Sequence, residues 1–309
     1  MMTNDGQALA FFNMQLTHIE SAIYKKQYPE KVWDKIIPVD TGVDPLAKTV
    51  TYYVGDRTGE AKLGANLLAD DIPIVNVNRA KNEVPIIEGT VGYRYSIIEV
   101  MQARKLGINL AADEAMAARD SYEDTMETLA LSGFALSGMS GLLNFPGVTI
   151  VAAPNGAASS PLWVNKTPDE ILADINAVLL GVYTSSNTVE MADHLLLDAA
   201  SYGLISSRRL TDTAMTIMQF VMSANVYTAK TGKPLTIMQL RQLGTAGGSA
   251  SKRMVAYKKD PDVLKMHLPM SLRFEAPQQR NFAFTVPGMW RTGGLNVRRP
   301  GAMRYMDGV

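Results

Sequence analysis

Residues 108–135 read INLAADEAMAARDSYEDTMETLALSGFA, and the pattern of this stretch decides the fold. Apolar and small side chains recur here at steps of three, four and seven, the spacing of one helical face; they are Ile108, Ala112, Ala115, Tyr122, Met126 and Leu129. Arg119 interrupts this stripe. Asn109 is a candidate N-cap, and Gly133 stands where a helix would stop. The stretch therefore predicts one long helix.

The rest of that helix surface is acidic and comprises Asp113, Glu114, Asp120, Glu123, Asp124 and Glu127. Such a charge run is typical of a solvated face rather than of a carboxylate pair or a cation site. Because crowded carboxylates repel one another, contact with a basic segment is expected. The candidates, from this chain or a neighbouring one, are Lys25, Lys26, Lys31 and Lys35. A helix with so narrow an apolar stripe must lie against a sheet or a neighbouring subunit.

Composition narrows the class of protein. The 309 residues are 47% hydrophobic and 19% charged, with 30 basic and 30 acidic residues and no cysteine. This length suggests about two domains, and a net charge of zero argues against wholesale coating of nucleic acid. Disulfides and thiolate metal sites are excluded. No secretory signal and no apolar run of roughly 18 residues is found, so we expect a soluble protein made in the cytosol.

The segments before the long helix predict an arm and a flap. Residues 1–47 look like an extended arm, with a short helix that starts at Thr17 and ends before Pro29. Alternating side chains predict strands at 50–54 and 91–97. The loop between these two strands is too long for a tight hairpin. A two-stranded flap of this kind is only marginally stable alone and needs a surface to lie on.

The segments after the long helix mix helix and strand signals. Thr167-Pro168-Asp169-Glu170 predicts a strong helix start, with a capping box and proline at the first position. Further helices are expected at 98–105, 199–205, 215–222 and 235–243, and strands at 194–197, 254–257, 264–274, 282–286 and 295–309, the last interrupted by Pro300-Gly301. This interleaving predicts an α+β fold.

No constellation of residues predicts catalysis, a cofactor or a metal. The histidines, His18, His194 and His267, lack ligand spacing, and His194 heads a buried strand. Residues 138–141 (GMSG) follow a helix rather than a strand, so a turn is favoured over a nucleophile elbow. Residues 244–252 and 231–234 lack the pattern of a phosphate loop, and we expect the first to be mobile. Arg298 and Arg299 are expected to be structural or to lie between subunits.

Several sequence blocks resemble one known family. They are 28–29 (YP), 37–41 (IPVDT), 141–144 (GLLN), 268–274 (LPMSLRF), 277–279 (PQQ), 291–294 (RTGG) and 298–305 (RRPGAMRY). Together with the order of arm, flap, long helix and final strand, they resemble the major capsid proteins of tailed bacteriophages, which have the Hong Kong 97 type fold. The C-terminal blocks carry most of this resemblance.

The resemblance implies an α+β fold with an N-terminal arm at 1–47 and an extended β-hairpin loop at 48–92 that lies over a neighbouring subunit. It implies a peripheral domain at 93–165 and 286–309, which holds the spine helix, and an axial domain at 166–285. Copies of the chain would form pentamers and hexamers of an icosahedral head that encloses double-stranded DNA without sequence-specific contacts. The protein would be part of the virion and would be assembled in the host cytoplasm.

The resemblance also implies partners. Some relatives carry a scaffolding segment before the arm; this chain shows none, so a separate scaffolding protein is expected, with a portal and a possible decoration protein. Some relatives form lysine–asparagine crosslinks between subunits. Lys62 and Lys81 lie in the loop, but no matching catalytic carboxylate can be assigned, and crosslinking is not expected.

Three other readings stay open at this point. An encapsulin-type nanocompartment shell has the same fold and holds protein cargo in place of a genome. A soluble α+β enzyme is disfavoured, because no catalytic set is found and an enzyme has little use for a long arm and flap. A tail or other virion component would assemble into rings or tubes.

Overall fold

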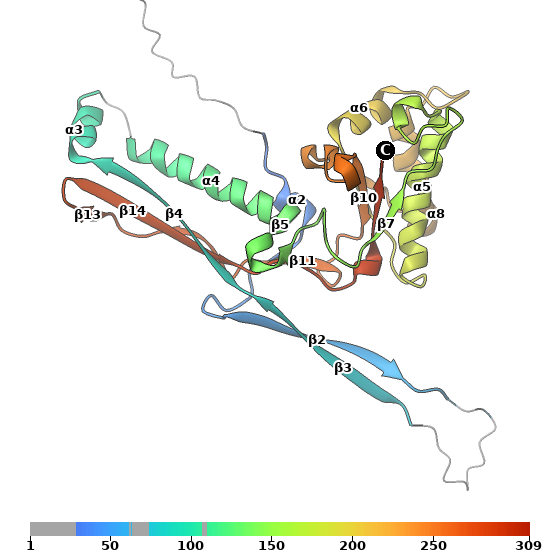
Figure 1. Cartoon of the computed structure of the whole chain (residues 1–309), viewed down its shortest axis with the longest axis horizontal. Helices are drawn as coiled ribbons and strands as arrows, with labels where there is room; N and C mark the ends of the chain where they lie inside the picture. The colour runs from blue at the N-terminus through green and yellow to red at the C-terminus, as the bar shows by residue number, and fades with distance from the viewer. Residues whose placement is uncertain (1–28, 62, 64–73, 107–109) are drawn as a thin grey trace, which may run out of the picture. The chain divides into compact units, whose positions relative to one another are not determined.

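The long helix is present in the computed structural model as α4, Leu110–Ser132 (Figure 1). The structure describes residues 29–61, 63, 74–106 and 110–309, so the predicted cap Asn109 lies outside it. Tyr122, Met126 and Leu129 of the predicted stripe are buried, which confirms the buried face. The helix ends at Gly133, whose φ of 78° lies in the left-handed region that glycine adopts without strain.

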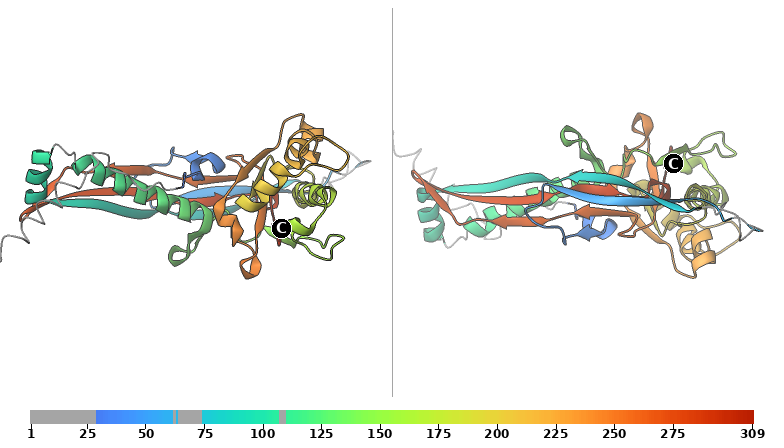
Figure 2. Two further views of the ribbon diagram at one scale, coloured as in Figure 1. Left: turned by 90° about the horizontal axis from the view of Figure 1, so that it is seen from above. Right: turned by 90° about the horizontal axis from the view of Figure 1, so that it is seen from below.

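A sheet lies against α4, as its apolar stripe requires. β14 (Ala283–Thr292) pairs antiparallel with β4 (Ile87–Ser96) over its whole length, and with β12 (Met270–Phe274) and β13 (Gln278–Arg280) along its other edge. Tyr122 of α4 meets Trp290 of β14 edge to face, with ring centroids 5.2 Å apart. Figure 2 shows β4 and β14 running side by side along α4 in two further views.

The flap is a ribbon of β2 (Thr49–Thr58) and β3 (Asn76–Pro85), paired antiparallel over ten residues. The prediction of a loop after residue 54 was wrong, because β3 lies within it. The strand predicted at 91–97 is part of β4 and pairs with β14, not with β2. The sequence of β3, NVNRAKNEVP, has few residues that favour strands; pairing with β2 overrides its weak propensity.

The beginning of the described chain is not a free arm. α2 (Trp33–Ile36) and the following Ile37 are buried in the same core as α4. β1 (Val39–Asp40) pairs parallel with β11 (Leu264–His267), which pairs antiparallel with β15 (Gly294–Val297). The buried Tyr257 hydroxyl donates to the Ile36 carbonyl oxygen at 2.7 Å. The expectation of an unpacked arm is therefore wrong for residues 33–40; the predicted helix at Thr17 lies outside the described residues.

A five-stranded sheet forms the second half of the fold. Its strand order is β7 (Thr149–Ala152), β16 (Met303–Asp307), β10 (Arg253–Tyr257), β8 (His194–Leu197) and β9 (Thr236–Gln239). The helices around it are α5 (Pro168–Ser185), α6 (Ala199–Ser207), α7 (Ile217–Ser223) and α8 (Val226–Thr231). Buried side chains of α5 and β8 share a second core with β10 and α7.

Two local predictions in this half have opposite outcomes. The capping box of α5 is confirmed, since Thr167 accepts from the Glu170 backbone and Glu170 accepts from the Thr167 backbone. The helix predicted at 235–243 is wrong: the segment forms β9 and a 3₁₀ turn at Arg241–Gly244. Parallel pairing with β8 draws this apolar run into the sheet, because a short apolar run has no decisive period of its own.

The remaining elements are short. α3 (Ile97–Leu106) follows β4 and confirms the helix predicted at 98–105. β5 (Gly133–Phe134) and β6 (Met139–Ser140) form a small hairpin across a 3₁₀ turn at Ala135–Ser137. The turn predicted at 138–141 is therefore wrong for Met139 and Ser140, which pair with β5; only Gly138 belongs to the turn. Further 3₁₀ turns lie at Trp163–Asn165, Gly248–Ala250 and Pro300–Ala302.

Candidate assembly surfaces

The histidines and carboxylates that the structure describes do not gather into a metal site. No group of three or more metal-binding side chains occurs among those residues. His194 contacts Asp193 at 2.8 Å between Nδ1 and Oδ1, whereas His267 is buried in β11 in another sheet. None of the described helices has the length and apolarity needed to cross a membrane. The functional features are instead surfaces and the contacts that fix them.

The flap exposes almost all of its side chains. Along β2 and β3 only three residues are half-buried, and all the others are exposed. Tyr53 and Val77 are 66% and 61% exposed. Lys81, one of the two lysines considered for crosslinking, forms an ion pair with Glu83 on the same strand; Lys62 lies outside the described residues. A ribbon of this length with both faces in water and exposed apolar side chains at Tyr53, Val54 and Val77 indicates a surface that another chain covers.

The root of the flap is fixed by one aromatic side chain. Tyr52 of β2 donates a hydrogen bond from its hydroxyl to Asn296 Oδ1 of β15 at 3.3 Å. The Arg298 guanidinium lies over the Tyr52 ring, 5.1 Å from its centroid. The flap is thus joined to the three-stranded sheet, and Arg298 has a structural contact within the chain, as predicted.

A polar cluster joins the arm end to that same sheet. Asp40 of β1 forms an ion pair with Lys265 and lies 3.3 Å from Nδ1 of the buried His267. The hydrogen bond from Lys265 lowers the pKa of Asp40 although burial opposes it. Burial lowers the pKa of His267, and the nearby Lys265 charge adds to this shift. These contacts hold β1 in register with β11.

A groove of about 560 Å³ opens between α4 and β4. Leu129, Phe134 and Trp290 supply apolar lining, and Glu88 and Asp124 supply carboxylates. Gly89 permits this packing, since a Cβ atom there would meet Trp290 at 2.1 Å. The prediction that the acidic face of α4 is solvated is wrong for Glu127, which is buried and accepts a hydrogen bond from Gln242 at 2.6 Å.

The last strand is fixed by a buried ion pair. Arg253 of β10 donates from Nε and Nη2 to the two carboxylate oxygens of Asp307 at 2.6 and 2.7 Å, and from Nη1 to the Leu143 carbonyl oxygen at 2.6 Å. Burial raises the pKa of Asp307, but the hydrogen bonds from Arg253 and the Gly248 amide outweigh it, and the net shift is downward. Asp307 also accepts a hydrogen bond from the Gly248 amide at 3.0 Å and so holds the 244–252 loop, the segment that lacks the pattern of a phosphate loop.

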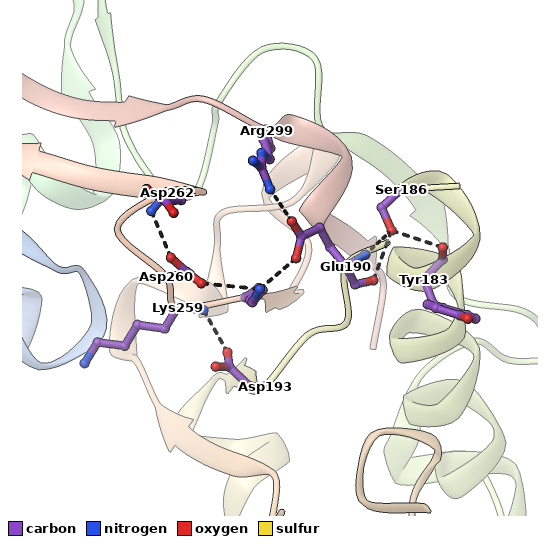
Figure 3. A network of polar contacts seen from close by, with 9 residues as sticks. Tyr183, Ser186, Glu190, Asp193, Lys259, Asp260, Asp262 and Arg299 are labelled. Atoms are coloured by element: carbon purple, nitrogen blue, oxygen red, sulfur yellow. Dashed lines mark hydrogen bonds and ion pairs between the residues drawn. The ribbon is translucent and has the colours of Figure 1, made fainter. Parts of the chain in front are cut away.

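A second network ties the loop after α5 to the start of the last strand (Figure 3). Glu190, buried, accepts from Lys258 at 2.8 Å and forms an ion pair with Arg299. These contacts, the Lys258 hydrogen bond first, hold the pKa of Glu190 below its ordinary value against the effect of burial. Ser186 caps the same loop by donating to the Glu190 carbonyl oxygen at 3.0 Å. Arg299 is therefore structural within the chain, as predicted.

Sequence patterns gave little sign of these contacts. The partners in the two networks are separated by 54 residues for Arg253 and Asp307 and by 68 for Lys258 and Glu190. Isolated charges at such separations carry no spacing signal. The Lys166–Asp174 pair is close in the sequence, eight residues apart. Both side chains are almost wholly buried 2.5 Å apart, and Trp163 Nε1 donates to the same Asp174 oxygen.

Comparison with known proteins identifies the fold. The structure is similar to the capsid of Myoviridae phage XM1, with a TM-score of 0.81 and 20% identity over 96% of this chain and 98% of that chain. It is also similar to the capsid of a native GTA particle, with a TM-score of 0.65 and 13% identity over 97% and 98% of the two chains. A virus-like particle from Pyrococcus furiosus matches at a TM-score of 0.50 and 12% identity, over 88% and 90%.

Sequence comparison adds the family. No curated protein sequence matches the chain. A family model described as major capsid protein matches residues 59–309, which include β3, α4 and all elements of both larger sheets. The α+β fold of the Hong Kong 97 type, expected from the sequence blocks, is thereby confirmed. With most of its length matched, the chain belongs to the family of major capsid proteins and is a structural component of a capsid shell.

Proposed function

We propose that copies of this chain assemble into pentamers and hexamers that close into an icosahedral head around double-stranded DNA. The observation that carries this proposal is the flap: ten paired residues per strand with nearly every side chain exposed. A two-stranded ribbon is marginal in water, so its order in the particle comes from lying on a neighbouring copy. Folding of such a segment is then coupled to assembly.

The domain division that we propose follows the strand pairing. The unit around five- and six-fold axes comprises about 149–257 with the final strand β16, because β7, β16, β10, β8 and β9 form one sheet. The peripheral unit comprises β4, α4 and the strands from β11 to β15. Compared with the division expected from the resemblance, 264–285 moves to the peripheral unit, whereas 149–165 and β16 move to the axial one.

The acidic helix α4 has a role in this proposal. Its 23 residues include six carboxylates and one arginine. On the lumenal side of a shell, this charge would keep packaged DNA from adhering to the wall. Replacing Asp120 and Asp124 by Lys is expected to slow genome release. Release and packaging at the wild-type rate would remove this role from α4.

Electron microscopy and sedimentation of the purified chain test the main proposal, with and without a co-expressed scaffolding protein from the same genome. Uniform closed shells, or rings of five and six copies, are the expected result. Nucleic acid within native particles would support the viral head, and protein cargo would instead indicate a nanocompartment. A monomer that never assembles under any of these conditions contradicts the proposal. A single monomer band after boiling in denaturant is expected, because no catalytic carboxylate for a lysine–asparagine crosslink can be assigned in the sequence.

A further inference from the structure

One end of the peripheral sheet carries an unusual turn. β13 and β14 are joined by Asn281 and Phe282, between the paired residues Arg280 and Ala283. Asn281 has a φ of 55°, which asparagine tolerates. Phe282 is 83% exposed at the tip of this turn, a position where small and polar residues dominate. A large aromatic side chain held in water there indicates a contact that the isolated chain does not make.

The helix beside this turn also leaves apolar side chains exposed. The Ile97 amide at the start of α3 donates to the Phe282 carbonyl oxygen at 3.0 Å, so the helix begins against the turn (Figure 1). Ile98 and Met101 lie three residues apart on α3, so they share one side of the helix, and each is 66% exposed. No side chain of α3 that the structure describes is buried. A ten-residue helix is marginal without packing, so α3 needs a surface that covers Ile98 and Met101.

Charged groups flank these three apolar side chains, which we call the tip patch (Ile98, Met101 and Phe282). Glu99 lies on α3 and Arg280 at the end of β13 beside the turn, and both are exposed. The Ser96 amide and hydroxyl hold the pKa of Glu99 below its ordinary value, so this side chain is an anion at neutral pH. Arg280 makes no ion pair with any residue that the structure describes. One patch therefore presents apolar area beside both signs of charge, which lets it match the same patch on a second copy.

We propose that the tip patch is a contact between copies of this chain, in which Phe282 of one copy packs on Ile98 and Met101 of the next. Arg280 of one copy then faces Glu99 of the other. This inference rests on the proposed assembly and names the surface through which neighbouring copies meet at the end of the peripheral unit. The occupant is a second copy because identical chains supply both the apolar area and the opposite charges.

The first experiment uses the Phe282→Ser variant and measures its critical concentration for assembly by sedimentation. Burial of one phenylalanine side chain corresponds to about tenfold or more in affinity, so a rise of at least about tenfold is expected. Leu136→Ser is the matched control, because Leu136 is 91% exposed on the β5–β6 hairpin. Both variants should melt at the wild-type temperature, since neither side chain is buried. Assembly of Phe282→Ser at the wild-type concentration overturns the inference.

Charge reversal tests the orientation. Arg280→Glu should weaken assembly by placing two carboxylates face to face, and a second change, Glu99→Gln, should restore it. Glutamine keeps the acceptor that caps α3, where Ser96 and Glu99 form reciprocal hydrogen bonds. Equal assembly of Arg280→Glu with and without Glu99→Gln excludes this pairing.

Crosslinking provides a readout that does not depend on weakened assembly. The chain has no cysteine, so a single Gln102→Cys on the exposed face of α3 can be joined by a short bismaleimide only to another copy. Shells of Gln102→Cys should give crosslinked oligomers, and shells of Val189→Cys, 71% exposed elsewhere, should give fewer. Shells of Gln102→Cys that form normally but give no more crosslinked oligomers than shells of Val189→Cys would overturn this inference and leave the proposed function standing. Absence of shells from the wild type would overturn the proposed function itself.

Discussion

The substitution Asp307→Asn should strongly lower the free energy of unfolding of the unassembled chain. Asp307 accepts two charge-assisted hydrogen bonds from Arg253, whose side chain is 6% exposed. The substitution keeps the shape of the carboxylate and removes its charge. Arg253 is then left as a buried cation that retains the Leu143 carbonyl, one amide oxygen and its contact with the Tyr305 ring, without a compensating negative charge.

The magnitude follows from two independent estimates. Each hydrogen bond to a charged group contributes about 1.5–3 kcal/mol, so two bonds give about 3–6 kcal/mol. Removal of one partner from a buried ion pair is destabilising by about 3–5 kcal/mol. Since Asp307 is 16% exposed in its side chain and partly hydrated, we expect a loss of about 3 kcal/mol in the free energy of unfolding.

Urea unfolding of the unassembled chain, at a concentration below that needed for assembly, measures this loss. Glu275→Gln is the control: its pair with Arg273 has side chains 43% and 64% exposed, and an exposed pair contributes at most about 1 kcal/mol. The double variant Arg253→Met, Asp307→Leu should recover most of the stability, because it leaves no unpaired charge. A loss below about 1 kcal/mol for Asp307→Asn refutes the role of this pair.

Three further predictions concern the two cores and the response to acid. Met126→Ala removes a wholly buried side chain of α4 and should lower the free energy of unfolding by about 2–5 kcal/mol in urea titrations; Met116→Ala, on the exposed side of the same helix, should change it little. Thr167→Ala removes the N-cap of α5 and should lower the melting temperature through a loss of about 1 kcal/mol, whereas Thr167→Ser should retain most of it. The pKa of Glu190 is lowered in the folded chain by its cationic partners, so its stabilising contribution is present above its ordinary pKa of 4.5 and is lost as the pH falls below that value. Unfolding measured across this range should show a shallower acid dependence in Glu190→Gln; an unchanged slope would contradict the assignment.

Local elements with a strong internal signal could be predicted from the sequence. Tyr122, Met126 and Leu129 recur on one helical face, and Gly133 ends that helix, because helical period and glycine at a C-terminus are local physics. The start of α5 at Thr167 was predicted for the same reason, since a capping box lies within four residues. The family could also be identified, because short blocks near the C-terminus retain its pattern.

Elements that depend on a distant partner could not be predicted. β3 has almost no strand propensity and exists because β2 lies beside it. The segment 235–243 carries an apolar run that suits a helix or a strand, and pairing of β9 with β8 decides between them. The arm residue Trp33 reads as part of an extended segment, but its indole donates to Glu123 of α4 at 2.9 Å.

The sequence by itself determined the long helix and the capped helix α5, since each depends on residues close together in the chain. It also determined the class of fold and the family, through the order of local elements and through short sequence blocks that can be recognised one at a time. Only the tertiary structure decided which strands pair, which carboxylates of α4 are buried and which apolar side chains stay in water. Glu127 and Asp124 lie on the same helix three residues apart, yet the first is buried against Gln242 and the second lines the groove beside β4. Burial depends on what packs against each side of a helix, and that is set by segments far away in the chain.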